Sequence, residues 1–256
     1  MRPVWLVLWL AGPWLAACSE LAAEPPLRVG TSGEYAPFTF REDGQLAGIE
    51  IEFAKAFAEA AGRELELVQV PLVDLIDALV EGRIDVIMSG MSVTPGRQQE
   101  VAFTEPYLRV GQMALIRSEE RDQRSQRDQL DLPETRIGFR TGTTGEQFVR
   151  SSVKLAELVP VQSIDEGVQA LRDERIDYFV HDAPTIWRIV GGFTSTETEL
   201  TGIYRPLTEE YLAWAVRQSD RDLAAQLDAS LSQWREDGRL ELVLDTWIRV
   251  RRIVVD

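Results

Sequence analysis

Short apolar runs typical of strands alternate along this chain with longer segments in which apolar residues recur at helical spacing. Residues 27–31 form the first strand-like run, and residues 49–60 form the first helical segment. A second helical pattern over 72–80 is followed directly by the apolar run 84–88, and a last helical face covers 240–248. This alternation predicts an α/β protein with largely parallel sheets.

The first residues have the pattern of an export signal. An apolar run at 4–10 is much shorter than the roughly 20 residues that cross a bilayer, and the segment 15–18 resembles the lipobox of bacterial lipoproteins. We expect residues 1–18 to be a lipoprotein signal peptide, Cys18 to carry the lipid, and 19–26 to be a tether. The alternative is an ordinary exported leader that is removed together with its cysteine. Both readings predict a protein of the periplasm.

The composition mainly excludes partners and chemistries. Asp and Glu number 42 against 27 Lys and Arg, and the formal net charge of -15 disfavours contact with the phosphate backbone of nucleic acids. One cysteine and one histidine exclude a disulfide framework, a zinc finger and a multi-histidine metal site. We therefore expect no nucleic-acid partner, no metal and no cofactor, and a site built from carboxylates, arginines and hydroxyl groups.

Two segments of the chain echo each other. Residues 78–85 and 170–177 share five of eight residues at an offset of 92, and both precede an apolar strand. Small or polar residues follow each strand, at 89–92 and at 181–184. Open α/β sheets bind ligands beyond the carboxyl ends of their strands, so the echo predicts two similar lobes that face each other across a cleft.

Four motifs in one order resemble the family 3 solute-binding proteins of bacterial amino-acid ABC importers. They are Gly30–Phe38, Ser89–Arg97, Gly142–Thr144 and His181–Pro184, and the likeness runs over residues 27–248. The resemblance implies a type II periplasmic binding protein, in which two Rossmann-like lobes joined by two crossing strands close over one ligand.

The resemblance also implies a domain organisation and a function. Lobe 1 is expected to comprise residues 27–109 and 211–256, lobe 2 residues 110–210, and the crossings to lie near 107–112 and 208–213. We expect a monomeric, lipid-anchored periplasmic protein that captures a small polar ligand, an amino acid above all, and presents it to an ABC permease in the inner membrane.

An amino acid is a zwitterion, so its site needs one cation and one anion, because an unpaired buried charge is expensive. Arg97 suits the carboxylate, which a guanidinium grips with two hydrogen bonds, and it matches the family's carboxylate-binding arginine. Asp182 matches the family's ammonium-binding aspartate. The alternatives are a surface arginine at Arg97 and a helix N-cap at Asp182, ahead of a helix over 184–190.

The resemblance assigns further residues to the ligand. Arg140 and His181 match positions where family members differ, and a cation beside a polar ring favours a ligand whose side chain carries a carbonyl or carboxylate. Either residue could instead be structural, with Arg140 paired to a surface acid. The others are hydroxyl residues, glycines whose N–H groups are expected to be open to the ligand, and residues that would surround the ligand's side chain. In that order they are Ser89, Ser92 and Thr144, then Gly90 and Gly142, then Tyr35 and Leu72, and each could equally serve a turn or the core.

Two other functions remain open. The segments 88–94 and 106–109 also resemble periplasmic cyclohexadienyl and arogenate dehydratases, whose general acid is a glutamate three residues after the aspartate that corresponds to Asp182. Thr185 stands at that place, and a hydroxyl is too weak an acid for the task, although Glu146 or Glu210 could substitute. The other possibility is a sensing module that acts through a partner protein. We expect a binding protein and not an enzyme.

Overall fold

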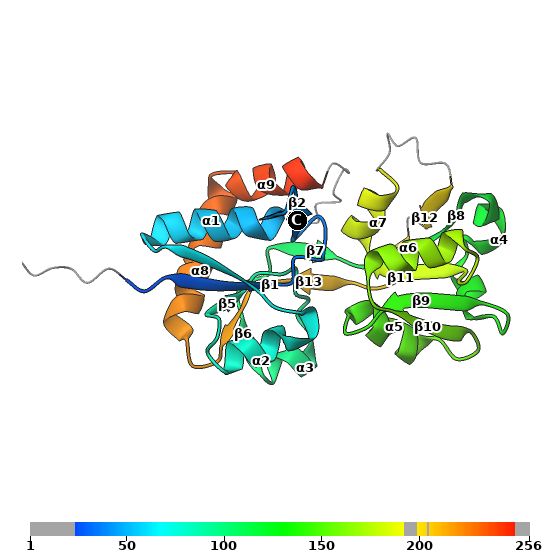
Figure 1. The fold of residues 1–256 in the computed structure, drawn as a ribbon, viewed down its shortest axis with the longest axis horizontal. Coiled ribbons are helices and arrows are strands. Elements are labelled where there is room, and N and C mark those ends of the chain that lie inside the picture. Colours follow the sequence, from blue (N-terminus) through cyan, green and yellow to red (C-terminus); the bar gives the residue numbers. More distant parts are fainter. Residues whose placement is uncertain (1–23, 192–198, 204, 249–256) are drawn as a thin grey trace, which may run out of the picture.

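The computed structural model describes residues 24–191, 199–203 and 205–248. Two sheet-containing lobes lie at opposite ends of the molecule, which confirms the predicted two-lobed α/β fold (Figure 1). The expected signal peptide and the lipid attachment site at Cys18 lie outside the described residues.

Lobe 1 contains a five-stranded sheet. Its strands, from edge to edge, are β4 (Leu65–Gln69), β1 (Leu27–Thr31), β5 (Val86–Ile87), β14 (Ala215–Arg217) and β6 (Val101–Phe103). β1 is parallel to both of its neighbours, whereas β14 is antiparallel to both of its own. A hairpin of β2 (Phe40–Glu42) and β3 (Gln45–Ala47) follows β1 in the chain.

Lobe 2 repeats this arrangement. Its strands, from edge to edge, are β10 (Glu157–Val161), β9 (Arg136–Arg140), β11 (Tyr178–Asp182), β8 (Gln112–Arg117) and β12 (Leu200–Ile203). β9 is parallel to both of its neighbours, and β8 is antiparallel to both of its own. Both sheets therefore have three parallel strands, then one reversed strand, then an edge strand that again runs in the direction of the first three.

Helices cover both faces of each sheet (Figure 1). In lobe 1, α1 (Ile49–Ala61), α8 (Arg221–Glu236) and α9 (Arg239–Trp247) cover one face, and η1 (Leu72–Asp74), α2 (Leu75–Val80) and α3 (Pro95–Gln98) lie towards the other. In lobe 2, α6 (Ile164–Arg172) and α7 (Ala183–Ile189) cover one face and α5 (Thr144–Ser152) the other, while η2 (Ser118–Glu120), α4 (Arg121–Arg124) and η3 (Arg127–Asp131) connect β8 to β9.

The sequence patterns anticipate these helices closely. α1 begins where its apolar periodicity begins, and Gly62 ends it in the left-handed conformation with φ of 66°. The pattern over 72–80 becomes a short 3-10 turn followed by α2. The carbonyl of Pro71 accepts the Asp74 N–H at 2.9 Å and that of Leu72 accepts the Leu75 N–H, as in a 3-10 helix.

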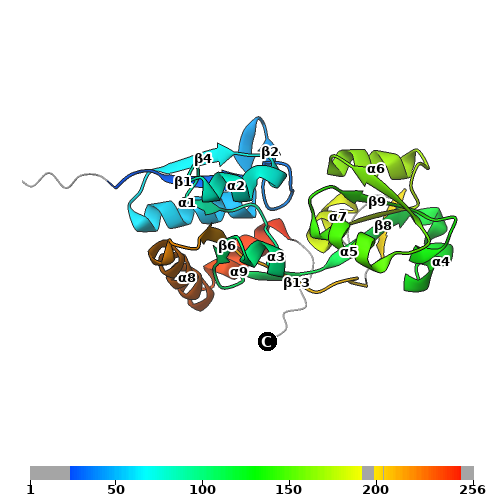
Figure 2. The ribbon, with the colours of Figure 1, turned by 90° about the horizontal axis from the view of Figure 1, so that it is seen from below.

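Two strands cross between the lobes as a pair. β7 (Leu108–Val110) lies antiparallel to β13 (Glu210–Leu212), and together they form a two-stranded ribbon (Figures 1 and 2). The expected lobe boundaries at 109/110 and 210/211 fall inside these strands and stay a prediction.

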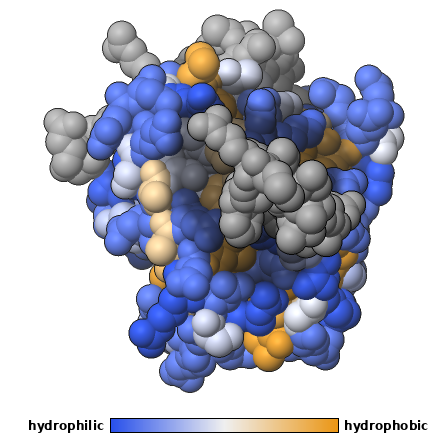
Figure 3. Space-filling view, turned by 90° about the vertical axis from the view of Figure 1, so that its left-hand side faces the viewer, coloured by the Kyte–Doolittle hydropathy of each residue, from blue (hydrophilic) through white to orange (hydrophobic). Residues whose placement is uncertain are grey.

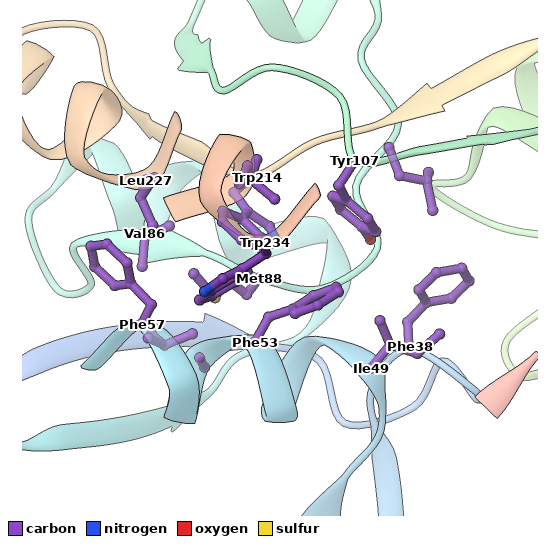
Figure 4. Close-up of a cluster of buried hydrophobic side chains, with 14 of the residues drawn as sticks. Phe38, Ile49, Phe53, Phe57, Val86, Met88, Tyr107, Trp214, Leu227 and Trp234 are labelled. Carbon is purple, nitrogen blue, oxygen red and sulfur yellow. The ribbon is translucent and has the colours of Figure 1, made fainter. Parts of the chain in front are cut away.

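The core of lobe 1 beside the crossings is aromatic (Figure 4). Phe53 of α1 lies at its centre, with ring centroids 5.7 Å from Tyr107, 5.7 Å from Trp214 and 5.6 Å from Trp234. Tyr107 and Trp214, which flank the two crossings, are themselves 5.8 Å apart. Large rings at these separations bury much apolar surface and hold α1 against the roots of both crossing strands.

The end of lobe 1 seen in Figure 3 is mainly hydrophilic, with apolar side chains in small separate patches. This distribution agrees with the excess of acidic over basic residues in the sequence. Within the part of the chain that the structure describes, no helix has both the length and the apolar character needed to cross a membrane.

A largely buried aspartate ends the repeated segment in each lobe, just before the middle strand. Asp85 accepts the backbone N–H of Arg28 at 3.0 Å and its guanidinium at 2.7 Å. Asp177 accepts the same two groups of Arg136, at 2.8 Å and 3.0 Å. Burial raises the pKa of each carboxyl, the arginine hydrogen bonds lower it, and the net shift is downward.

A second arginine, from the neighbouring antiparallel strand, completes both clusters. It contacts the aspartate and also donates to two backbone carbonyl groups of the repeated segment. In lobe 1 these contacts run from Arg217 to Asp85, Leu79 and Ile84, and in lobe 2 from Arg117 to Asp177, Leu171 and Ile176. The echo in the sequence thus corresponds to the same polar cluster at the same place in two sheets.

Replacement of Asp177 tests the structural weight of this cluster. Asp177→Ala leaves buried arginine groups without their acceptor, and we expect the free energy of unfolding to fall by about 3–5 kcal/mol. Asp173→Ala, which removes an exposed acid whose oxygen lies 3.6 Å from Arg175, is the control and should cost less than about 1 kcal/mol. Urea denaturation measures both, and equal effects would contradict the assignment.

Candidate functional site

A cavity of about 350 Å³, part of it open to solvent, lies between the facing ends of the lobes. Nine of the eleven residues that the sequence nominated line it, namely Tyr35, Leu72, Gly90, Ser92, Arg97, Arg140, Thr144, His181 and Asp182, and Met91 and Thr143 complete the wall. Ser89 and Gly142 are outside the lining.

The expectation of open N–H groups at Gly90 and Gly142 is wrong for this structure. Gly90 donates to Glu50 Oε1 at 2.8 Å, and Gly142 donates to Glu146 Oε2 at 2.8 Å. Buried backbone donors are rarely left unpaired, and each of these finds a carboxylate in the first turn of a nearby helix. The Gly90 partner depends on how α1 packs, which the sequence motif does not record, whereas the Gly142 partner is only four residues along the chain.

The turn after β5 is shaped by close packing. Gly90 has φ of 64°, and a Cβ there would lie 2.6 Å from the Tyr35 ring, so only glycine fits. Ser89 lies behind the cavity wall, where its hydroxyl donates to Ser32 Oγ at 3.2 Å and accepts the Ser32 N–H at 3.0 Å. Ser89 therefore holds the turn against the first strand of the sheet.

Asp182 is a buried carboxylate at the carboxyl end of β11. It occupies the N-cap position of α7, but its side chain makes no capping hydrogen bond and instead accepts from the hydroxyl of Tyr35 and from Nε2 of Gln112. Burial, together with the charge of Glu210, raises the pKa of Asp182 to about 7, against the opposing effects of these hydrogen bonds and of Arg97. The carboxylate therefore faces the cavity.

Arg97 lies on the opposite side of the cavity, in α3. Thr94 caps this helix by accepting the Arg97 N–H at 3.3 Å, and the guanidinium donates to the backbone carbonyl of Ser92 at 2.8 Å. Burial lowers the pKa of Arg97, while Asp182 and the other nearby acids raise it. Among the described residues no carboxylate lies within salt-bridge distance of this guanidinium, so its remaining donors can serve an anion.

Gln112 is a functional candidate that the motifs missed, and it lies beside Glu210, which the sequence offered only as a substitute acid. Nε2 of Gln112 contacts Asp182 and also lies 3.0 Å from Glu210 and 3.2 Å from Thr144. Glu210 also accepts the Ser92 hydroxyl at 2.8 Å. A polar residue at the start of the apolar strand β8 was the available signal for Gln112. Within the described residues, no group of three or more His, Cys, Asp and Glu side chains could hold a metal.

Arg140, at the end of β9, bridges the lobes. Its guanidinium lies 2.7 Å from Glu34 Oε2 of lobe 1 and 3.3 Å from the Glu34 carbonyl oxygen. The arginine side chain is buried, whereas that of Glu34 is 61% exposed. The possibility that Arg140 pairs with a surface acid therefore holds, and the pair also joins the two lobes.

Thr185 has a structural partner. Its hydroxyl, on α7, donates to the carbonyl of Ala36 in lobe 1 at 3.0 Å, which is another contact between the lobes. Glu146, one of the two possible substitutes for a catalytic acid, accepts from Gly142 and lies 2.8 Å from Arg150. These contacts and its own downward pKa shift, which opposes the effect of burial, make Glu146 a poor proton donor.

His181 is buried with one ring nitrogen unpartnered. Nδ1 accepts the backbone N–H of Asp182 at 2.8 Å, so the ring proton of the neutral form sits on Nε2. Nε2 has no hydrogen-bond partner among the described residues. Burial, and then the charge of Arg140, lower the pKa of His181 to about 3, which keeps the ring neutral at physiological pH.

Two proteins of known function are similar to this chain in sequence. The chain is 28% identical to the arginine-binding extracellular protein ArtP of Bacillus subtilis over 95% of this chain and 97% of that protein. It is 32% identical to the cyclohexadienyl dehydratase of Pseudomonas aeruginosa over 61% of this chain and 59% of the enzyme.

Solved structures give the same fold. The putative binding component of an ABC transporter from Wolinella succinogenes, complexed with lysine, superposes with a TM-score of 0.83 at 29% identity over 87% of this chain and 95% of that one. Such structures are of the type II periplasmic binding class, so the expected fold class is confirmed. Residues 27–250 match the sequence pattern of one family. The chain belongs to the bacterial extracellular solute-binding proteins, family 3.

Proposed function

We propose that the protein captures one small polar amino acid between its lobes and presents it to an ABC importer. The observation that carries the proposal is the opposition of Arg97 and Asp182, one cation and one buried carboxylate from different lobes on the wall of one cavity. Relatives that bind amino acids support it.

A zwitterion satisfies both groups at once. Its carboxylate would accept from the free donors of Arg97, and its ammonium would donate to Asp182. An adjacent ammonium favours the ionised carboxylate, so binding would draw the pKa of Asp182 below about 7. Because Tyr35 of lobe 1 already reaches Asp182, a ligand there would contact both lobes and favour closure.

The ligand's side chain is proposed to carry a hydrogen-bond acceptor. His181 has an unpartnered Nε2–H at the cavity, and Arg140 offers a guanidinium whose partner Glu34 is exposed and can exchange with a ligand. A cationic side chain such as lysine would meet Arg140 at the same end of the cavity, where like charges repel. A carbonyl or carboxylate is the complementary group.

We infer that the protein binds without catalysing dehydration, although a dehydratase is among its relatives. Thr185 stands where those enzymes are expected to hold their acid, and its hydroxyl is engaged with Ala36. A threonine hydroxyl cannot donate a proton as a tuned carboxyl does.

The proposed setting is the periplasm, with the mature protein a monomer held to a membrane by lipid on Cys18. The sequence support is the lipobox-like segment that ends at Cys18. Membrane-extracted protein should have Cys18 as its first residue and the mass of attached fatty acids, and Cys18→Ser should abolish both. Cleavage at another site without fatty acid would contradict this prediction.

The proposed pairing of Arg97 and Asp182 with the two charges of an amino acid is tested first by a thermal-shift screen of the twenty amino acids. A ligand at 100 times its Kd stabilises the protein by about 2.7 kcal/mol. With the ligand found, Arg97→Ala and Asp182→Ala should each weaken binding by about 2–5 kcal/mol in calorimetry, because each leaves one ligand charge buried and unpaired.

Arg83→Ala is the matched control, since it removes an exposed lobe 1 arginine that pairs with Glu81 at the surface. It should bind like the wild type. Binding by Arg97→Ala or Asp182→Ala within twofold of wild type, about 0.4 kcal/mol, would show that the residue has no such role.

The state of His181 can be read directly, because it is the only histidine in the chain. In 15N NMR spectra we expect the Nε2–H tautomer and no protonation between pH 8 and pH 5, since burial lowers the pKa of His181 to about 3. The Nε2–H signal should shift when the ligand binds. A titration midpoint near the ordinary histidine value would contradict the proposed neutral donor.

Prephenate separates a binding protein from a dehydratase. Without a placed general acid the reaction loses roughly 100-fold to 10,000-fold, so phenylpyruvate formation, followed by ultraviolet absorbance, should not exceed the protein-free control. Turnover clearly above that control and abolished by Arg97→Ala would establish the enzyme instead.

A further inference from the structure

Glu50 is a fully buried carboxylate in the first turn of α1, and no cation lies within salt-bridge distance of it among the described residues. Three donors stabilise it. Oε1 accepts the Gly90 N–H at 2.8 Å and the Tyr107 hydroxyl at 2.5 Å, and Oε2 accepts the indole N–H of Trp214 at 2.8 Å. A buried carboxylate is costly, so its presence calls for a reason beyond filling space.

The three donors come from the three segments that must move together in a closing cleft. Gly90 lines the cavity. Tyr107 directly precedes β7, and Trp214 follows β13 by two residues, so these two side chains stand at the roots of both crossings. One carboxylate therefore ties the loop beside the ligand to both connections between the lobes.

Only a carboxylate meets all three requirements. Both of its oxygens accept hydrogen bonds, whereas an amide of the same shape offers one acceptor oxygen and one NH2 group. A glutamine at position 50 would point its NH2 group either at the indole N–H of Trp214 or at the Gly90 and Tyr107 donors. In both cases a donor would face a donor. Burial raises the pKa of Glu50 to about 7, against the three hydrogen bonds that lower it.

We propose that Glu50 is a positioning residue that couples occupation of the cavity to rotation of the lobes, by fixing the Gly90 loop to the roots of β7 and β13. It does not contact the ligand. A ligand that orders the Gly90 loop thereby orders both crossings, and the lobes close in one geometry. This inference rests on the proposed function, because it presumes that an amino acid fills the cavity.

Glu50→Gln is the direct test, and Glu52→Gln is its matched control. Glu52 lies on the same helix and also accepts an indole N–H, from Trp247 at 2.8 Å, but it touches neither the loop nor the crossings. Tyr107→Phe, which removes only the hydroxyl and keeps the ring, is the second variant should Glu50→Gln fail to fold.

The probe is an equimolar mixture of the twenty L-amino acids, titrated in a thermal-shift assay, with small-angle X-ray scattering to follow closure. For Glu50→Gln and Tyr107→Phe we expect the midpoint for the mixture to rise about tenfold, as for a buried group left unpaired, and the compaction on adding the mixture to shrink. Glu52→Gln should lower thermal stability but keep the wild-type midpoint and compaction.

The outcomes separate the two ideas. If the wild type responds to no amino acid, the proposed function is wrong and this inference is lost with it. If the wild type responds and Glu50→Gln or Tyr107→Phe binds and compacts as the wild type does, Glu50 is only structural and the inference alone is wrong. Equal losses in Glu52→Gln would also overturn it.

Discussion

The carboxylate of Asp182 is the group on which the cleft depends. The fold removes it from water and supplies neutral donors, Tyr35 and Gln112, in place of an arginine. Burial raises its pKa to about 7, so the ligand-free site holds a carboxylate whose charge is incompletely compensated. An ammonium group removes that deficit, and the guanidinium of Arg97 offers the complementary place for a carboxylate. In the proposed function, this unmet charge is what favours a zwitterion.

Two other largely buried acids, Asp85 and Asp177, are treated in the opposite way. Asp85 and Asp177 each receive arginine hydrogen bonds from two strands, and their pKa values are lowered. These clusters fix the middle strand of each sheet, so the strand ends that carry the site have rigid supports. The paired charges of Asp85 and Asp177 stabilise the two sheets, whereas the incompletely paired charge of Asp182 faces the cavity.

In the proposed function, Thr185 is the side chain that separates binding from dehydration. Thr185 bridges to Ala36 of lobe 1 and so contributes to closure, whereas a carboxyl at the same place would bring an acidic proton to the cleft. Glu50 is a carboxylate with a different task, since its donors belong to the cavity loop and to the roots of the crossings. Site chemistry and domain motion are thus carried by separate acids.

The sequence by itself determined the alternation of strands and helices and the two similar lobes, because hydrophobic periodicity is local. The choice of Arg97 and Asp182, which both line the cavity, came instead from the resemblance to a family. The sequence motifs missed Gln112 and misjudged the N–H groups of Gly90 and Gly142. Most of those features depend on partners distant in the chain, as with Gly90 and Glu50, which are 40 residues apart, whereas Gly142 and Glu146 are four residues apart and form a local contact. Only the tertiary structure decided which polar groups pair with each other and which stay free for a ligand, since hydrogen bonding depends on distances that no local pattern records.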